Sequence, residues 1–279
     1  MIDVSDGTIS KRVPLFLPQK DCLQVRHQRR PGPRRFAVNH SFVFPRFRTS
    51  VLILSFLSPL HAASSDVIVM GFVGGFVRHN SSHHLEVQLA AHLSKDYPSG
   101  IAVRIFENHM GRQAHQEILR LLDADRNGTL SAGEKLKARI VLYGHSWGAS
   151  EAVTMARILE KDGVPVLLTI QVDSVSKPGK NDSLIPANVA QAINFYQLNG
   201  ILHGRQHILA ADPIHTQILG NFQVEYHTKS VNCEGYPWYA QVFMKPHIEI
   251  ESDPSVWNRI ESLIRSKLPP AIVSTPAAE

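Results

Sequence analysis

Short apolar runs alternate with longer segments of helical period from residue 65 onward, which is typical of βα units. The apolar runs predict strands over residues 66–70, 101–106, 139–143 and 164–172. The amphipathic segments predict helices over residues 85–93, 113–122, 149–159 and 186–198. The strand at 164–172 is nearly all apolar, as expected of a central strand covered on both faces. The alternation predicts a three-layer α/β fold in which helices flank a mostly parallel central sheet.

The last predicted helix has the clearest start signal. Asp253 can cap it, and Pro254 suits its first helical position. The apolar side chains that share one face of this helix are Val256, Ile260, Leu263, Ile264 and Leu268. We therefore expect the folded body to span residues 65–268, followed by a flexible tail over residues 269–279.

The positive charge of the chain is concentrated at its beginning. The net charge is +5, of which residues 1–64 contribute +7, so the remaining residues carry −2. A body of this charge lacks the basic surface that binding to nucleic acid requires, and we expect no such partner. The segment 29–35 is basic and proline-rich without an apolar period, and we expect residues 1–64 to be largely disordered.

Within that leader, residues 46–63 have the basic, apolar and small-residue parts of a secretory signal. The apolar run 51–60 is too short for a stable membrane span. The pattern favours export to the periplasm or the extracellular space, with translation beginning near Val43. The alternative is a cytoplasmic protein with a genuine N-terminal extension. Of the two cysteines, Cys22 lies in the leader and Cys233 in the body, so an exported chain would have no internal disulfide.

The segment Gly144-His145-Ser146-Trp147-Gly148 lies between a predicted strand and a predicted helix. In that context the G-x-S-x-G pattern indicates a sharp turn that holds a nucleophilic serine, Ser146, above the edge of the sheet. The amide of Trp147 would lie at the helix start, where an oxyanion can be bound. The alternative is a glycine-rich turn whose serine has no chemical role.

Around this turn, residues 66–268 resemble the α/β-hydrolase superfamily, in particular its lipases, esterases and thioesterases. The resemblance implies the α/β-hydrolase fold, an acyl-enzyme on Ser146 and no organic cofactor. It also implies a second oxyanion amide, from Phe72 or Val73, in the glycine-rich segment 69–75 after the first predicted strand. This segment lacks the spacing of the phosphate-binding motifs.

The superfamily order of serine, acid and histidine places both partners of the nucleophile after Ser146. Asp173 ends the strand 164–172, and the carboxyl ends of parallel strands share one rim with the serine turn. Asp173 is therefore the expected acid. Asp182 and Asp212 are the alternative acids. If Asp173 is not catalytic, it would cap the loop that follows the strand.

The resemblance places the base at His247, in a predicted loop at residues 245–250 just ahead of the last helix. Imidazole titrates near neutral pH, so it can accept the serine proton and return it to the leaving group. The other late histidines are His203, His207, His215 and His227, of which His227 is the second choice. The alternative to a catalytic role is that His247 is a surface side chain stacked on a proline.

Residues 123–134 have the sequence D-A-D-R-N-G-T-L-S-A-G-E, which matches the calcium-binding loop of an EF-hand. The motif predicts side-chain ligands from Asp123, Asp125, Asn127, Ser131 and Glu134, and a carbonyl ligand from Thr129. A helix is predicted before the loop, but residues 135–138 allow barely one helical turn after it. We expect a structural Ca²⁺ ion, and the alternative is an Asp- and Gly-rich solvent turn. The adjacent His83 and His84 have no zinc-ligand spacing, so the sequence predicts no zinc site there.

Together these features predict a serine hydrolase that acts on a small-molecule carboxylic ester or thioester. The segment 174–183 is polar and is expected to border the entrance. It is not an apolar lid, which favours a soluble substrate. The rival hypothesis is a non-catalytic, calcium-stabilised binding protein on the same scaffold.

Overall fold

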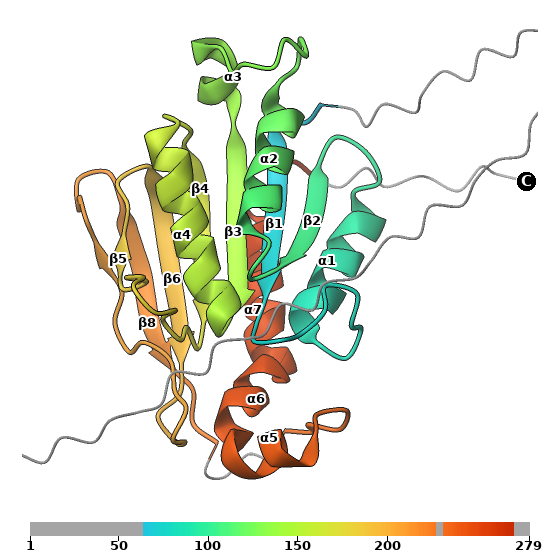
Figure 1. Ribbon diagram of the computed structural model, residues 1–279, viewed down its shortest axis with the longest axis vertical. Coiled ribbons are helices and arrows are strands. Elements are labelled where there is room, and N and C mark those ends of the chain that lie inside the picture. The colour runs from blue at the N-terminus through green and yellow to red at the C-terminus, as the bar shows by residue number, and fades with distance from the viewer. Residues whose placement is uncertain (1–63, 227–230, 271–279) are drawn as a thin grey trace, which may run out of the picture. The chain divides into compact units, whose positions relative to one another are not determined.

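The computed structural model describes residues 64–226 and 231–270 (Figure 1). The predictions for the leader, its signal-like segment, His227 and most of the tail lie outside these residues. None of the helices in the described ranges is long and apolar enough to cross a membrane.

Within the described residues, six parallel strands form one sheet in the order β2-β1-β3-β4-β6-β8. These strands are β1 (Val67–Val73), β2 (Ala102–Glu107), β3 (Arg139–His145), β4 (Val166–Val172), β6 (Val189–Tyr196) and β8 (Gln217–Gln223). A short pair, β5 (Leu184–Ile185) and β7 (Leu209–Ala210), forms a second, two-stranded sheet. The sheet confirms the predicted α/β fold class.

The helices are α1 (Leu85–Asp96), α2 (Gly111–Leu122), α3 (Ala132–Lys137), α4 (Trp147–Lys161), α5 (Trp238–Phe243), α6 (Lys245–Glu251) and α7 (Pro254–Arg265). As predicted, Asp253 caps α7, accepting a 2.9 Å hydrogen bond from the amide of Ser255. Figure 1 shows α2 and α4 in front of the sheet and α7 behind it.

Alternate side chains of the strands point to opposite faces of the sheet, as strand geometry requires. In β3, Ile140 and Leu142 pack with the apolar faces of α2 and α4. Val141 and Tyr143 of the same strand pack on the other face with α1 and α7. The two apolar layers hold the sheet between its helices. They thereby hold in place the edge of the sheet at which the strands end.

Two predicted elements were wrong. The predicted helix at 186–198 is the strand β6, whose residues 192–196 are all buried. Its apolar residues satisfy the helical period, but a short buried run fits a covered strand equally well. The predicted loop at 245–250 is the helix α6, in which Pro246 occupies the first turn, where its missing amide hydrogen is tolerated.

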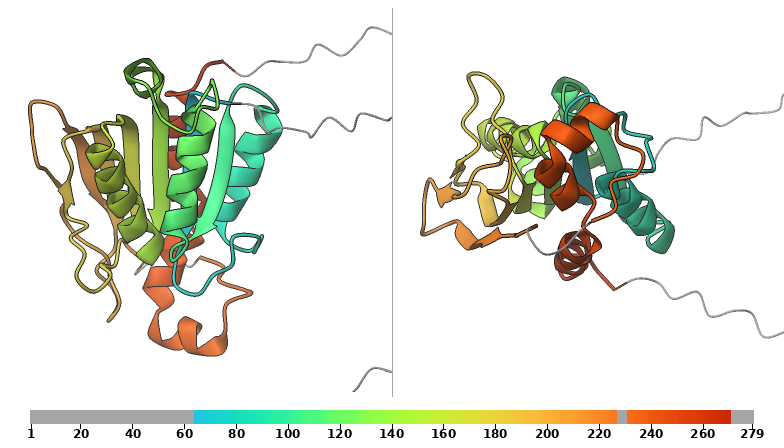
Figure 2. Two further views of the ribbon diagram at one scale, coloured as in Figure 1. Left: turned by 45° about the horizontal axis from the view of Figure 1, so that its top comes forward. Right: turned by 90° about the horizontal axis from the view of Figure 1, so that it is seen from below.

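The helices α5 and α6 lie at the end of the sheet where β3 ends and α4 begins (Figure 1). Seen from below in Figure 2, they lie in front of the strand ends. The short helix α3 lies at the opposite end of the sheet. The fold therefore places the serine turn and the predicted calcium loop at opposite ends of β3.

Candidate active site

Ser146 joins β3 to α4 in a strained backbone conformation, with φ 54° and ψ −124°. The flanking glycines allow the close approach of strand and helix that this turn needs. A Cβ atom on Gly144 would lie 2.5 Å from the carbonyl carbon of Gly148, and one on Gly148 would lie 2.0 Å from the oxygen of Phe72. Because no larger residue fits at either position, the G-x-S-x-G pattern has a steric cause here.

Asp173 directly follows β4 and is fully buried. Its Oδ2 lies 2.6 Å from Nδ1 of His247, which α6 carries. The same carboxylate accepts hydrogen bonds from the amide of Gly204 at 2.7 Å and the side-chain amide of Gln197 at 2.8 Å. These contacts fix the carboxylate and orient the imidazole through its Nδ1 atom.

Burial alone would raise the pKa of Asp173, because it disfavours the charged carboxylate. The hydrogen bonds from His247 and Gln197, together with the charge of a protonated His247, outweigh burial and hold the pKa below its usual value. Asp173 is therefore ionised at neutral pH. An ionised carboxylate at Nδ1 stabilises the imidazolium that forms when His247 accepts a proton.

Ser146 and His247 line one pocket of about 790 Å³ at the strand ends. Its walls are mostly apolar and include Phe76, Trp147, Leu202, Pro237, Tyr239, Ala240, Met244 and Ile248. Among the described residues, no hydrogen bond joins the Ser146 hydroxyl to His247. Such bonds commonly tighten only when substrate binds. The pocket thus offers a nucleophile and a carboxylate-bound histidine to one apolar ligand.

The alternative acids and bases within the described residues, which exclude His227, do not line this pocket. Asp182 is buried and accepts hydrogen bonds from Ser174 and from Arg205, the latter at 2.9 Å. Asp212 pairs with the exposed His215 at 2.7 Å. The side chains of His203 and His207 are also exposed. The geometry therefore favours Asp173 and His247 over each of these alternatives.

The predicted oxyanion residues lie at different depths. Trp147 begins α4, so its amide has no partner within the helix, and its side chain lines the pocket. Phe72 and Val73 belong to β1, are fully buried and do not line the pocket. The following residues Gly74–Phe76 do line it.

No sequence pattern pointed to His145, which is buried beneath the catalytic candidates. Its ring centroid lies 4.5 Å from that of His247, and its Nε2 lies 3.2 Å from the His247 carbonyl oxygen. Burial lowers the pKa of His145 to about 4, so its ring is neutral at pH 7. It therefore supports α6 without placing a second positive charge next to His247.

The predicted calcium loop precedes and enters α3. Carboxylate oxygens of Asp123, Asp125 and Glu134 all lie within 4.8 Å of one another. Gly128 has φ +82°, the sharp turn that the motif requires. Hydrogen bonds from the Ser131 amide, the Ser131 hydroxyl and the Ala124 amide lower the pKa of Glu134 to about 2, which keeps it charged.

The remaining predicted calcium ligands have local partners. The Asn127 side-chain oxygen accepts hydrogen bonds from the amide of Thr129 at 2.8 Å and from its hydroxyl at 2.7 Å. Ser131 and Glu134 form a capping box at the start of α3. A capping box is itself a common reason for a Ser and a Glu at this spacing. The three clustered carboxylates fit a Ca²⁺ ion, which prefers oxygen ligands.

Comparison with known proteins gives structural matches alone. No protein-family model matches the chain, and no curated protein matches it. A solved structure of RedJ with a polyethylene glycol molecule in its active site matches with a TM-score of 0.38 and 10% identity, over 73% of this chain and 90% of that one. The RedJ thioesterase of the prodiginine pathway in Streptomyces coelicolor matches with a TM-score of 0.37 and 11% identity, over 77% and 98%. Scores this low carry no argument about chemistry, so a function can be inferred only from the site itself.

Proposed function

We propose that this protein is a serine hydrolase of the α/β-hydrolase type that cleaves a carboxylic ester or thioester through an acyl-enzyme on Ser146. The proposal depends above all on the contact between His247 and Asp173 beside a pocket that Ser146 also lines. These three side chains come from the end of β3, the end of β4 and α6, so only the fold brings them together.

In the proposed reaction, Nε2 of His247 accepts the hydroxyl proton of Ser146 while Oγ attacks the carbonyl carbon of the substrate. The ionised Asp173 stabilises the resulting imidazolium. His247 then returns the proton to the leaving alcohol or thiol, as the bond to that group breaks and the acyl-enzyme remains. A water molecule, activated by His247, attacks the acyl-enzyme in the same way and releases the acid and free Ser146.

The negative oxygen of each tetrahedral intermediate needs backbone donors. We propose the amide of Trp147 as the first. Phe72 and Val73 lie within β1 and do not line the pocket, whereas Gly75 and Phe76 do. We therefore propose the amide of Gly75 or Phe76 as the second donor.

The pocket walls extend the proposal to the substrate. The sequence favoured a soluble substrate because the segment 174–183 is polar. The residue of this segment that lines the pocket is the apolar Val175, so the polar residues of the segment do not form the pocket wall. Helix α5 instead contributes Tyr239 and Ala240 to the wall. A pocket of this size and lining favours an ester or thioester with an apolar acyl chain.

We also propose that the loop 123–134 binds Ca²⁺ in a structural role. The loop lies at the amino end of β3 and Ser146 follows its carboxyl end, so the seven residues of β3 place them about 20 Å apart. A Ca²⁺ ion there would hold the connection between α2 and β3 in place. Its distance from Ser146 leaves it no contact with the substrate.

The test uses esters and thioesters with short and long acyl chains, assayed with the full-length, calcium-loaded protein. We expect turnover that rises with acyl length up to the depth of the pocket and that is lost in Ser146→Ala. The matched control is Ser150→Ala, which removes a buried serine from the same helix and should retain activity. A folded protein without turnover on the whole panel would favour the non-catalytic binding protein.

A further inference from the structure

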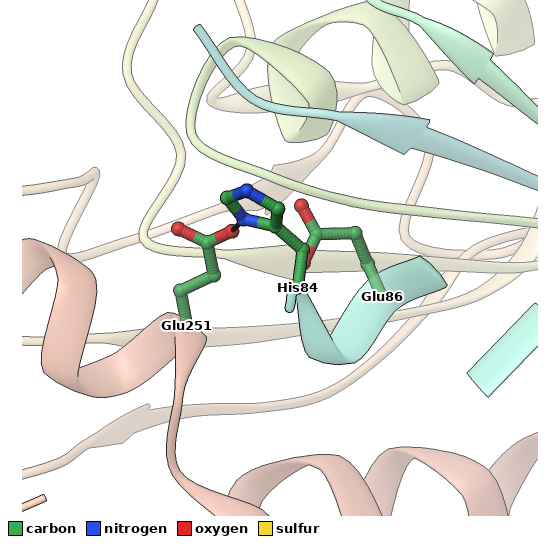
Figure 3. Close-up of side chains that lie close together, drawn as sticks. All are labelled: His84, Glu86 and Glu251. Atoms are coloured by element: carbon green, nitrogen blue, oxygen red, sulfur yellow. Dashed lines mark hydrogen bonds and ion pairs between the residues drawn. The ribbon is translucent and has the colours of Figure 1, made fainter. Parts of the chain in front are cut away.

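Three ionisable side chains that take no part in the proposed reaction meet beside the pocket. His84 immediately precedes α1, Glu86 lies in the first turn of α1, and Glu251 is the last residue of α6. One ligand atom of each lies within 4.8 Å of those of the other two. Figure 3 shows the imidazole and the two carboxylates gathered at one point.

Glu86 is the side chain that needs an explanation. It is fully buried, and neither of its carboxylate oxygens has a hydrogen-bond partner among the described residues. Burying a carboxylate without a partner is strongly unfavourable, and folded proteins rarely tolerate it. Figure 3 shows the carboxylate on the side of Glu86 that faces His84.

The electrostatic surroundings of Glu86 also disfavour an ionised carboxylate without a cation beside it. Burial raises the pKa of its carboxyl well above the usual value, and the neighbouring Glu251 raises it further. A cation between the two carboxylates would remove this repulsion.

The other two side chains contact each other and also lie close to groups outside the cluster. Nδ1 of His84 contacts Glu251 and lies 3.3 Å from the Tyr236 hydroxyl. The other carboxylate oxygen of Glu251 lies 3.3 Å from Nδ1 of His145. The contacts with Tyr236 and His145 come from outside the cluster, and contacts of this kind help to orient a ligating imidazole or carboxylate.

We propose that His84, Glu86 and Glu251 bind a divalent transition-metal ion, for which Zn²⁺ is the best match. One imidazole nitrogen and two carboxylates are a ligand set that Zn²⁺ accepts, whereas Ca²⁺ and Mg²⁺ prefer oxygen ligands alone. Two carboxylates and a neutral imidazole carry a charge of −2, which the ion neutralises. His84 and Glu251 also line the pocket, which gives the ion a path of access.

The sequence predicted no zinc site here because the criterion was ligand spacing along the chain. His84 and Glu251 are 167 residues apart and meet only in the fold. The ion would join the start of α1 to the end of α6. Because Glu251 lies one helical turn beyond His247, the ion would help to position the base without contacting the substrate.

The test measures metal content and thermal stability in the full-length protein. The protein is stripped with a chelator, reloaded with saturating Ca²⁺ and titrated with Zn²⁺. We expect one Zn²⁺ per chain that excess Ca²⁺ does not displace, and a higher Tm after binding. Glu86→Gln should raise the Kd for Zn²⁺ more than about 100-fold, since loss of outer contacts alone costs 10–100-fold. The same variant should lose most of the rise in Tm that Zn²⁺ gives the wild type.

The matched control is Glu249→Gln, which changes a buried glutamate of the same helix outside the cluster and should leave Zn²⁺ binding unchanged. If Glu86→Gln does not fold, His84→Ala replaces it, because the side chain of His84 is only partly buried. The proposal is overturned if the wild type shows no saturable binding of one Zn²⁺ per chain. It is also overturned if the folded variants bind Zn²⁺ as tightly as the wild type. Either result would leave Glu86 and Glu251 as a carboxyl pair that shares a proton.

Discussion

Nδ1 of His247 lies 2.6 Å from Oδ2 of Asp173, although the two residues are 74 positions apart in the chain. The contact is buried, since His247 is 2% exposed and Asp173 is fully enclosed. Ser146, on a strained turn, lines the same pocket as His247, and we propose that the three side chains act as nucleophile, base and acid.

Asp173→Asn tests the acid in this arrangement. An amide at this position would favour the wrong tautomer of His247 and would no longer stabilise the imidazolium. We expect kcat to fall by about 10⁴-fold with little change in fold, which is the loss that this substitution causes in a Ser-His-Asp triad. The measurement is steady-state ester hydrolysis, and Asp212→Asn, which alters a carboxylate paired with an exposed histidine, is the control. Equal losses in the two variants would rule out Asp173 as the acid.

The same residue predicts a dependence of stability on pH. Because the pKa of Asp173 is lower in the folded chain than in the unfolded one, its ionisation stabilises the fold above the unfolded value, about 3.9. This contribution is lost as pH falls through the folded pKa. The free energy of unfolding in urea, measured from pH 7 downward, should therefore differ most between wild type and Asp173→Asn at neutral pH. A difference that does not shrink below pH 4 would contradict the assignment.

Removal of calcium should destabilise the protein. At a Ca²⁺ concentration of about 100 times Kd, binding adds about 2.7 kcal/mol to the free energy of unfolding. For a chain of this size that corresponds to a rise in Tm of about 5–10 °C. In protein freed of transition metals beforehand, a chelator should reverse the rise in the wild type and have no effect in Glu134→Gln. Glu225→Gln, on an exposed side chain, should behave like the wild type. A wild-type Tm that does not change with Ca²⁺ would show that the loop is not a calcium site.

The apolar wall of the pocket predicts selectivity for acyl length. Ala240 lies on α5 and lines the pocket, so Ala240→Phe would shorten the available space. We expect a higher KM for long acyl esters and little change for acetyl esters. Val242→Phe enlarges an exposed residue of the same helix that does not line the pocket. If both variants affect long and short esters alike, the acyl chain binds elsewhere.

The sequence predicted the serine turn and the sheet that carries it because each depends on local rules. The strand before Ser146 and the flanking glycines are contiguous, so their steric requirement is visible in one short segment. Asp173 could be proposed because the carboxyl ends of parallel strands share one rim. His247 could be proposed through the family resemblance, although its segment is a helix rather than a loop.

Other parts of the site could not be predicted because their partners are distant in the chain. Gln197 donates a hydrogen bond to Asp173 at 2.8 Å. Because residues 186–198 were predicted to form a helix, the sequence did not show that β6 ends next to Gln197, beside β4. Recognised as a strand end, this position would have pointed to the same rim. His145, Glu86 and Glu251 gave no sequence signal, because their proximity results from the packing of α1 and α6 around the end of β3.

In the proposed reaction, the hydroxyl of Ser146 is an activated nucleophile. The most direct measurement is intact-protein mass spectrometry after reaction with a fluorophosphonate, which bonds covalently to activated serines. We expect the folded wild type to gain the mass of a single adduct on Ser146, Asp173→Asn to react far more slowly, and Ser146→Ala to gain none. An unmodified wild type, or an adduct that persists in Ser146→Ala, would contradict the account.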